Sequence, residues 1–272
     1  MGKGSARVRG IEMAYDETGA AWGGDPLVLL HGFPFDRSMW RGQLEALGGE
    51  FRVVAPDLRG FGETTFADGM TMESMAEDVA ALLDELGLVR VVLGGLSMGG
   101  YVAFEFLRKF RGRVRALVLA DTRPQADADD ARRAREENAQ RALREGMEPI
   151  VGTMLPKLLA AGTRERGGEV VEGVRAMMLG TSPETAAAAL RAMAMRRDQT
   201  DLLPSIKVPA LIVVGAEDSH TPPSDAEAMS AKIEGSRLVV IEGAGHLSNV
   251  ERPEEFNRAL VEFMRGLPEM YG

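Results

Sequence analysis

The chain has 272 residues, of which 45% are hydrophobic and 27% are charged, and its formal net charge is −9 at pH 7. This length and apolar content are sufficient for a large core and fit one big α/β domain. The negative charge and a sequence pI near 5.1 disfavour nucleic acids and anionic membranes as partners, because both select basic surfaces. We therefore expect a small-molecule substrate.

Cysteine is absent, and the three histidines are His31, His220 and His246. Disulfides, thiolate metal ligands and a cysteine nucleophile are therefore excluded. Because the histidines form no zinc-binding cluster, we expect neither a metal nor an organic cofactor. Residues 1–20 contain no apolar leader segment, and no run approaches the ~18 apolar residues of a membrane span. These observations predict a soluble, cytoplasmic protein.

Short apolar runs alternate along the chain with longer segments of helical spacing, after an N-terminal stretch that predicts an antiparallel hairpin. The alternation predicts a parallel sheet covered by helices on both faces, with the site at the edge where the strands end. The hairpin is expected at 6–15, strands at 26–30, 51–55, 89–93, 116–120, 210–214 and 238–241, and helices at 72–86, 101–110, 223–233 and 253–264, the first capped by Thr71.

The alternation stops after residue 120, because residues 127–195 have helical character throughout. This segment predicts a helical cap inserted between two strands. We assign residues 1–122 and 206–272 to the core domain and 123–205 to the cap. The charged opening of the cap predicts a solvated helix face.

The cap is rich in methionine, and these side chains either fill its core or line a pliable pocket over the active edge. Trp40 is expected in the core or in the wall of an acyl pocket. The candidate substrate-binding residues are Trp40, Met154, Met178 and Leu247.

The most informative motif is Gly95-Leu96-Ser97-Met98-Gly99-Gly100, which lies between an apolar run and a helical segment. A serine on such a strand-to-helix turn adopts strained backbone geometry, which requires small residues two positions before and after it. The turn exposes the serine hydroxyl beside a helix N-terminus, with its free N–H groups. This pattern is a nucleophile elbow and makes Ser97 the candidate nucleophile.

A serine hydroxyl needs a base within hydrogen-bond distance and a third group that orients the base. His246 follows the last predicted strand in a glycine-rich loop, so it is the candidate base. His220 is the alternative, and a contact at the rim or in its own loop is its expected role. Asp218 is the candidate acid, because the chain order Ser97, Asp218, His246 is the one that accompanies a nucleophile elbow on an α/β sheet. Asp121 and Glu217 are the alternative acids.

An acyl-transfer intermediate also needs two N–H donors for its oxyanion. We expect these from the backbone of Met98 and of Phe33, which follows the first parallel strand. His31 is expected to brace that loop through its ring. Asp57 and Arg59 are expected to form an ion pair with each other.

Taken together, these segments resemble the α/β-hydrolase fold enzymes of the esterase and lactonase type. The resemblance covers the whole chain and implies a mostly parallel sheet of about eight strands flanked by helices, with a helical cap after strand 6. Haloalkane dehalogenases and epoxide hydrolases of this fold carry aspartate at the position of Ser97, so those reactions are disfavoured. The segments are His31-Gly32-Phe33-Pro34, Asp57-Leu58-Arg59-Gly60-Phe61-Gly62, residues 95–100, Gly215-Ala216-Glu217-Asp218 and Gly243-Ala244-Gly245-His246.

The subfamily stays open, because the chain is similar to 3-oxoadipate enol-lactonases, to acyl-homoserine lactonases of this fold and to cofactor-free perhydrolases. An anionic enol-lactone would require a fixed cation, for which Arg123, Arg196 and Arg197 are candidates. The sequence predicts a metal-free serine hydrolase of carboxylic esters or lactones. Perhydrolysis, carbon–carbon bond hydrolysis by the same residues and a slow small-ligand receptor are the alternatives.

Overall fold

The computed structural model describes residues 1–19 and 24–268, which form an eight-stranded sheet of order β1-β2-β4-β3-β5-β6-β7-β8. Strand β2 runs antiparallel to both β1 and β4. The other six strands, β3 to β8, are parallel to one another. This is the predicted mostly parallel sheet. The strands are β1 Gly2–Val8, β2 Ile11–Thr18, β3 Leu27–Leu30, β4 Val53–Pro56, β5 Val91–Leu96, β6 Val114–Ala120, β7 Ala210–Gly215 and β8 Arg237–Ile241.

The central strands are buried on both faces, which explains why they are continuous apolar runs without alternation. Strand β5 differs from its predicted bounds, since it begins at Val91 and continues to Leu96. Val89 is 79% exposed and lies outside the sheet. At the other end, Gly94 and Gly95 continue the ladder with β3 and β6. The strand therefore extends directly to the residue before Ser97.

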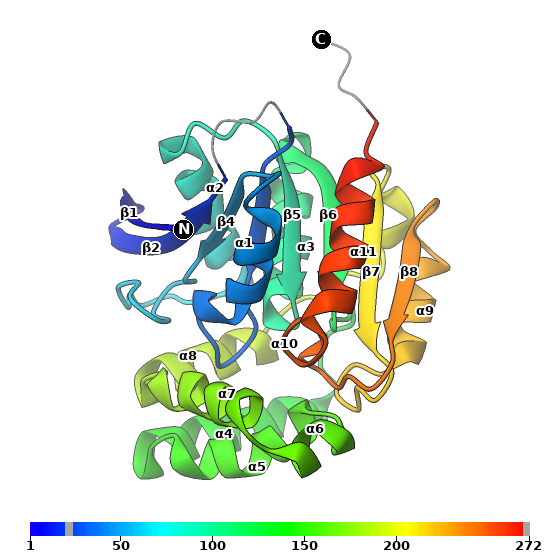
Figure 1. Cartoon of the computed structure of the whole chain (residues 1–272). Helices are drawn as coiled ribbons and strands as arrows, with labels where there is room; N and C mark the ends of the chain where they lie inside the picture. The colour runs from blue at the N-terminus through cyan, green and yellow to red at the C-terminus, as the bar shows by residue number, and fades with distance from the viewer. Residues whose placement is uncertain (20–23, 269–272) are drawn as a thin grey trace.

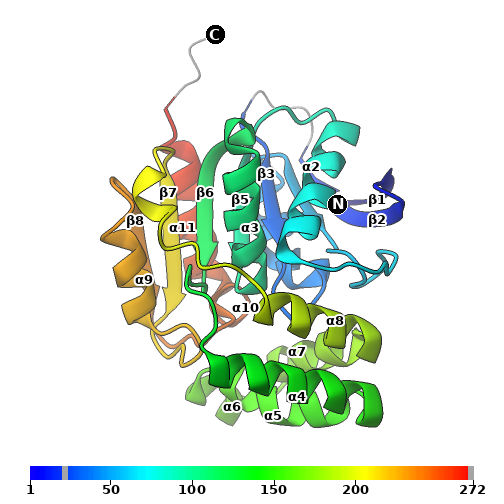
Figure 2. The same ribbon diagram turned by 180° about the vertical axis from the view of Figure 1, so that it is seen from behind.

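Helices cover both faces of the sheet, as Figures 1 and 2 show from opposite sides. Helices α1 and α11 lie on one face, and α2, α3 and α9 lie on the other. Thr71 caps α2 as predicted, in a capping box with Ser74. No helix in residues 1–19 and 24–268 has the length and apolarity to cross a membrane. These helices are α1 Arg41–Leu47, α2 Met72–Glu85, α3 Met98–Lys109, α9 Pro223–Ser230 and α11 Pro253–Arg265, with the short α10 at Ser248–Glu251.

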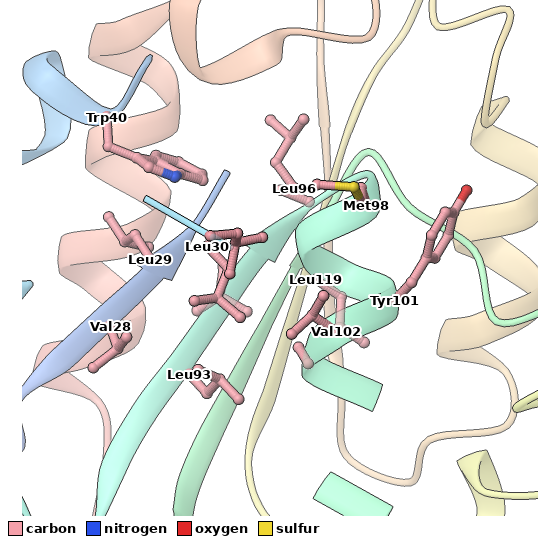
Figure 3. Close-up of a cluster of buried hydrophobic side chains, with 14 of the residues drawn as sticks. Val28, Leu29, Leu30, Trp40, Leu93, Leu96, Met98, Tyr101, Val102 and Leu119 are labelled. Carbon is pink, nitrogen blue, oxygen red and sulfur yellow. The ribbon is translucent and has the colours of Figure 1, made fainter. Parts of the chain in front are cut away.

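The main core lies between the sheet and these helices (Figure 3). Side chains of β3 and β5, such as Leu29 and Leu93, pack between Trp40 on one side and Val102 of α3 on the other. All four are at most 1% exposed. The close packing fixes β5 and α3, which flank Ser97, relative to each other.

Five helices lie between β6 and β7 in the sequence, across the end of the sheet at which the parallel strands terminate (Figure 1). We call α4–α8 the cap. In α4 most of the charged residues are exposed, while Ala139 and Ala142 are buried against the neighbouring helices. Helix α8 begins at Pro183, and the side chain of the preceding Ser182 caps its N-terminus. The cap helices are α4 Asp129–Glu145, α5 Glu148–Leu158, α6 Ala161–Arg166, α7 Glu169–Gly180 and α8 Pro183–Ala194.

The expected ion pair between Asp57 and Arg59 is wrong. Asp57 accepts hydrogen bonds from the backbone N–H of Arg37, at 2.7 Å, and from the Arg37 guanidinium. Arg59 donates two hydrogen bonds of 2.7 Å to Asp78 on α2. The two residues therefore pair with partners distant in sequence, and each pair braces the loop that follows β4.

Loss of Arg37 is expected to destabilise the fold strongly. Its guanidinium is 7% exposed, and the Asp57 carboxylate is fully buried. Arg37→Leu leaves that carboxylate without its cation, so we expect the free energy of unfolding to fall by about 3–5 kcal/mol in urea denaturation.

The control is Arg265→Leu, which removes the Arg265–Glu50 ion pair from the surface, where the Arg265 side chain is 64% exposed. Its expected cost is about 0–1 kcal/mol. Equal losses in the two variants would contradict a special role for the buried pair.

Candidate active site

Ser97 lies between the end of β5 and the start of α3, in the strained geometry that the motif predicts. Its φ is +54° and its ψ is −113°, a combination that non-glycine residues rarely adopt. A Cβ on Gly95 would collide with the backbone of Gly99, and a Cβ on Gly99 would collide with the Leu30 carbonyl. Both glycines are therefore required for the turn to close.

Strand β6 fixes the backbone of Ser97 from the other side. The Ser97 N–H donates to the carbonyl of Ala120 at 3.0 Å, and the Thr122 hydroxyl donates to the Ser97 carbonyl at 2.8 Å. The strained turn is thus held by hydrogen bonds at both of its backbone polar groups.

His246 and Asp218 are hydrogen-bonded to each other, with 2.8 Å between His246 Nδ1 and Asp218 Oδ2. Both are almost completely buried, at 2% and 3% exposure. Asp218 also accepts hydrogen bonds from the backbone N–H groups of His220 and Thr221 and from the Thr221 hydroxyl. These contacts fix the carboxylate so that it accepts from Nδ1–H, which leaves His246 Nε2 as an acceptor.

The electrostatics of this pair favour the charged forms of both residues. Burial lowers the pKa of His246, but the charge and hydrogen bond of Asp218 outweigh it, and the net pKa lies above the ordinary 6.5. For Asp218, burial raises the pKa, and the charge and hydrogen bond of His246 more than compensate, so that its pKa is lowered. Asp218 therefore stays ionised at neutral pH.

The two alternative acids have other contacts. Asp121 is completely buried beside Asp218 and accepts hydrogen bonds from the Gly215 N–H, at 2.8 Å, and from the Ser248 hydroxyl. Burial and the nearby charge of Asp218 raise its pKa to about 8. Glu217 is exposed and accepts from a cap N–H at 3.0 Å. The hydrogen bond to His246 thus belongs to Asp218.

Ser97 and His246 line one cavity of about 330 Å³ beneath the cap. No hydrogen bond within the described chain joins the Ser97 hydroxyl to the imidazole, and such bonds often shorten only when substrate binds. Core loops supply one side of the cavity, and α4, α5 and α8 supply the other. The lining residues are Phe33, Ser97, Tyr101, Arg123, Asp127, Ala131, Ala134, Arg135, Asn138, Thr153, Met154, Lys157, Leu158, Leu190, Met193, Ser219, His220 and His246.

Of the four candidate substrate-binding residues, Met154 lies in this lining. Trp40, Met178 and Leu247 require correction, because none of them is in the described lining and each is at most 1% exposed. Trp40 packs against Phe256, with 6.0 Å between ring centroids. Their side chains fill the core, which apolar residue type alone does not distinguish from a pocket wall.

Residues of α4 that were expected on a solvated face line the cavity instead. Ala131, Arg135 and Asn138 recur at helical spacing, so they share one side of α4. The small alanines among charged residues were the available signal for a face that approaches another element. Arg135 also forms an ion pair with the buried Asp127.

The three candidate cations lie in different places. Arg123 lines the cavity, and its ion pairs with Asp127 and Asp225 are long, at 3.6 and 3.9 Å. Arg196 is buried over the ring of Tyr101 and pairs with Asp127 at 2.8 Å. Arg197 pairs with Glu105, away from the cavity. Of the three, Arg123 is therefore the one that lines the cavity of Ser97 and His246.

The other two histidines have distinct surroundings. The ring of His31 braces its loop as expected: Nδ1 lies 2.9 Å from the Gly32 carbonyl, and Nε2 accepts from the Leu58 N–H. His220 lines the cavity, with its ring centroid 5.1 Å from that of His246. The surrounding protein and the charge of His246 lower the pKa of His220 to about 4. It is therefore neutral at pH 7.

The two expected oxyanion donors are the backbone N–H groups of Met98 and Phe33. Met98 is the first residue of α3, so its N–H has no partner within the helix. Phe33 lines the cavity. Within the described chain, neither N–H donates a hydrogen bond to another residue.

In residues 1–19 and 24–268, no group of three or more His, Asp or Glu side chains is arranged to hold a metal ion.

Comparison with known proteins gives a family and several close structural neighbours. Residues 25–253 match the family model described as alpha/beta hydrolase fold. A solved thermophilic esterase from Thermogutta terrifontis, with malate bound, is 45% identical, with a TM-score of 0.93 and coverage of 98% of this chain and 99% of that one. The solved enol-lactonase from Burkholderia xenovorans LB400 is 31% identical, with a TM-score of 0.89 and coverage of 96% and 100%.

A curated relative supports the same assignment. The 3-oxoadipate enol-lactonase 2 of Acinetobacter baylyi is 30% identical over 240 residues, which are 88% of each chain. The family model covers far more than half of the sequence. The chain belongs to the alpha/beta hydrolase fold family.

Proposed function

We propose that this protein hydrolyses a carboxylic ester or lactone through an acyl-Ser97 intermediate. The observation that carries the proposal is the cavity into which the elbow serine and the Asp218-oriented His246 both open. Relatives named esterase and enol-lactonase support this chemistry. The roles of Ser97, His246 and Asp218 are nucleophile, base and orienting acid.

In the acylation step, His246 Nε2 takes the proton of Ser97 as Oγ attacks the substrate carbonyl. The carbonyl oxygen becomes an oxyanion, which accepts hydrogen bonds from the N–H groups of Phe33 and Met98. Collapse of this intermediate breaks the bond to the leaving alkoxide, and protonated His246 donates its proton to that oxygen. In a lactone the released alcohol stays attached to the acyl group.

Deacylation repeats the sequence with water as the nucleophile. His246 takes a proton from water, and the resulting oxygen attacks the acyl-serine carbonyl. The second tetrahedral intermediate collapses to a carboxylic acid, and His246 returns the proton to Ser97. Asp218 remains ionised throughout and stabilises each imidazolium that forms.

The cap provides the substrate-binding wall in this proposal, and we take residues 123–205 as the cap domain and 1–122 with 206–272 as the catalytic domain. The wall has an apolar part, formed by Met154, Leu158, Leu190 and Met193. Its polar part contains Arg123 and Lys157. A cavity of about 330 Å³ with both characters suits a small acyl group that carries a polar or anionic end.

Ser97→Ala is expected to lower kcat by at least about 10⁴-fold without unfolding the protein, because it removes the nucleophile but no packing atoms of note. The measurement is the initial rate by pH-stat on matched linear esters and lactones, with circular dichroism to verify folding. Ser236→Ala, in the loop before β8, is the control that keeps full activity.

The second measurement uses an aryl phosphonate, whose phosphorus is attacked by an activated serine with loss of the aryloxide. Mass spectrometry is expected to place the adduct on Ser97. Turnover by purified Ser97→Ala would refute the mechanism. Labelling without ester or lactone turnover would direct attention to perhydrolysis or carbon–carbon hydrolysis, and absence of both would favour a ligand receptor.

The pH profile is expected to report His246. The base must be neutral to accept a proton, and Asp218 holds its pKa above 6.5, so kcat/KM should rise with pH through an apparent pKa higher than 6.5. Asp218→Asn removes the negative charge, so both the apparent pKa and kcat should fall, the latter by about 10⁴-fold. A wild-type profile that is flat from pH 5 to 8 would exclude a histidine base.

Arg123→Gln is expected to weaken anionic substrates selectively. A charge-assisted hydrogen bond to a substrate carboxylate is worth about 1.5–3 kcal/mol, which corresponds to a loss of about 10- to 100-fold in kcat/KM. The test compares a monoaryl succinate with an aryl butyrate of the same acyl length. Arg132→Gln, on the outer side of α4, is the control. Equal losses for both esters would reject Arg123 as the anion-binding residue.

A further inference from the structure

The cap contacts the loop of His246 at the junction between α5 and α6. We call residues 158–161 the cap corner. The backbone N–H of His246 donates to the carbonyl of Leu158 at 2.9 Å. Gly245 approaches so closely that a Cβ there would lie 2.7 Å from the Ala160 nitrogen. The base loop and the cap corner are therefore in direct backbone contact.

The carboxylate of Glu251 joins these same two segments. Glu251 is the last residue of α10 and is 6% exposed. Its Oε1 accepts the N–H of Gly245 at 2.7 Å, and its Oε2 accepts the N–H of Ala160 at 2.8 Å. One side chain thus accepts hydrogen bonds from two buried N–H groups. Gly245 is 6 residues from Glu251 in sequence, and Ala160 is 91 residues from it.

No Lys, Arg or His in the described chain forms an ion pair with Glu251. Burial raises its pKa, and the charge of Glu217 raises it further, whereas the Thr163 side chain and the N–H groups of Ala160 and Gly245 act in the opposite direction. Burying an unpaired carboxylate is costly unless its oxygens accept hydrogen bonds. The two N–H groups of the base loop and the cap corner, together with the Thr163 side chain, therefore stabilise the carboxylate at this position.

The contacts reach the reacting groups within one residue on either side. Gly245 immediately precedes His246, and Leu158 of the cap corner lines the cavity. A displacement of the Gly245 peptide therefore moves the imidazole relative to Asp218 and Ser97. A displacement of the cap corner moves the apolar wall against which the acyl group would lie.

We propose that Glu251 is a positioning residue for His246, whose carboxylate locks the base loop to the cap corner so that the base and the substrate wall keep one fixed relation. This inference rests on the proposed role of His246. It implies that any cap movement that admits substrate occurs away from residues 158–161. Separation at the corner would release the base.

Glu217 provides a matched control on the same corner. Its Oε2 accepts the N–H of Ala161 at 3.0 Å, but its side chain makes no described hydrogen bond to the base loop. Removing the Glu217 carboxylate thus takes one anchor from the cap corner alone. Removing the Glu251 carboxylate releases the corner and the base loop together.

The test compares Glu251→Ala, Glu251→Gln and Glu217→Ala in the full-length protein. We expect Glu251→Ala to lower kcat about 10- to 100-fold, since small misplacements of catalytic groups cost this much. KM should change less than kcat. The apparent pKa of the base should move toward 6.5, because a loosened His246 loses part of its contact with Asp218. Glu251→Gln keeps one acceptor oxygen and should lie between wild type and Glu251→Ala. Glu217→Ala should keep the wild-type kcat and pH profile.

Hydrogen exchange, followed by mass spectrometry without substrate, is the second readout. Peptides covering 158–161 and 243–247 should both exchange faster in the Glu251 variants, whereas only the first should do so in Glu217→Ala. If Glu251→Ala does not fold, Glu251→Gln is nearly isosteric and carries the same comparison.

Either of two kinetic results would overturn the inference: a wild-type kcat and pH profile in the Glu251 variants, or an equal kcat loss in Glu217→Ala. Unchanged exchange at 243–247 would also overturn it, whatever the chemistry of the enzyme. Failure of the proposed function is recognised separately, since it would appear as turnover by Ser97→Ala.

Discussion

The end of β6 is the constraint on which the rest of the site depends. Three consecutive residues there contact all the segments that carry reacting groups. Ala120 accepts the Ser97 N–H, and Thr122 donates to the Ser97 carbonyl. Between them, Asp121 receives the Gly215 N–H at the start of the Asp218 turn and the Ser248 hydroxyl just beyond His246. Asp121 itself has a φ of +43°, so its backbone is strained like that of Ser97. Three segments that are distant in sequence thus take their mutual positions from one short stretch of a central strand.

The two buried carboxyl groups of this cluster, Asp121 and Asp218, have pKa values that are shifted in opposite directions. Both lie near the imidazole of His246. Ionising both at once is unfavourable, because two negative charges would then be buried close together. Asp121 has its pKa raised to about 8 by burial and by Asp218, whereas Asp218 has its pKa lowered, mainly because His246 offsets its burial. One carboxyl group is therefore ionised at neutral pH and matches the single positive charge that His246 would acquire in the proposed catalytic cycle. Their interaction also means that the observed titrations belong to the group and not to one residue.

Local patterns explain why much of this could be predicted from the sequence. The elbow depends on Gly95 and Gly99, two positions on either side of Ser97. Asp218 and His246 follow strands that are recognisable as continuous apolar runs. Features that depend on distant partners were not accessible. Asp57 and Arg59 are two residues apart, yet each pairs across the fold, with Arg37 and Asp78. In the cap, apolar side chains could not be divided into core and cavity wall, because the difference is set by which helix faces the sheet and not by residue type.

The backbone contact between Gly245 and residues 158–161 has a consequence for the exchange of substrate specificity between relatives. The cap is one continuous insertion between β6 and β7, so an exchange of whole caps between relatives would need only two junctions in the sequence. Here a transplanted cap would also have to reproduce the path of its main chain at one internal bend, where it offers a carbonyl to the His246 N–H and leaves no room for a side chain on Gly245. Diversification of the binding wall is therefore easier by point changes on α4 and α8 than by recombination of whole caps.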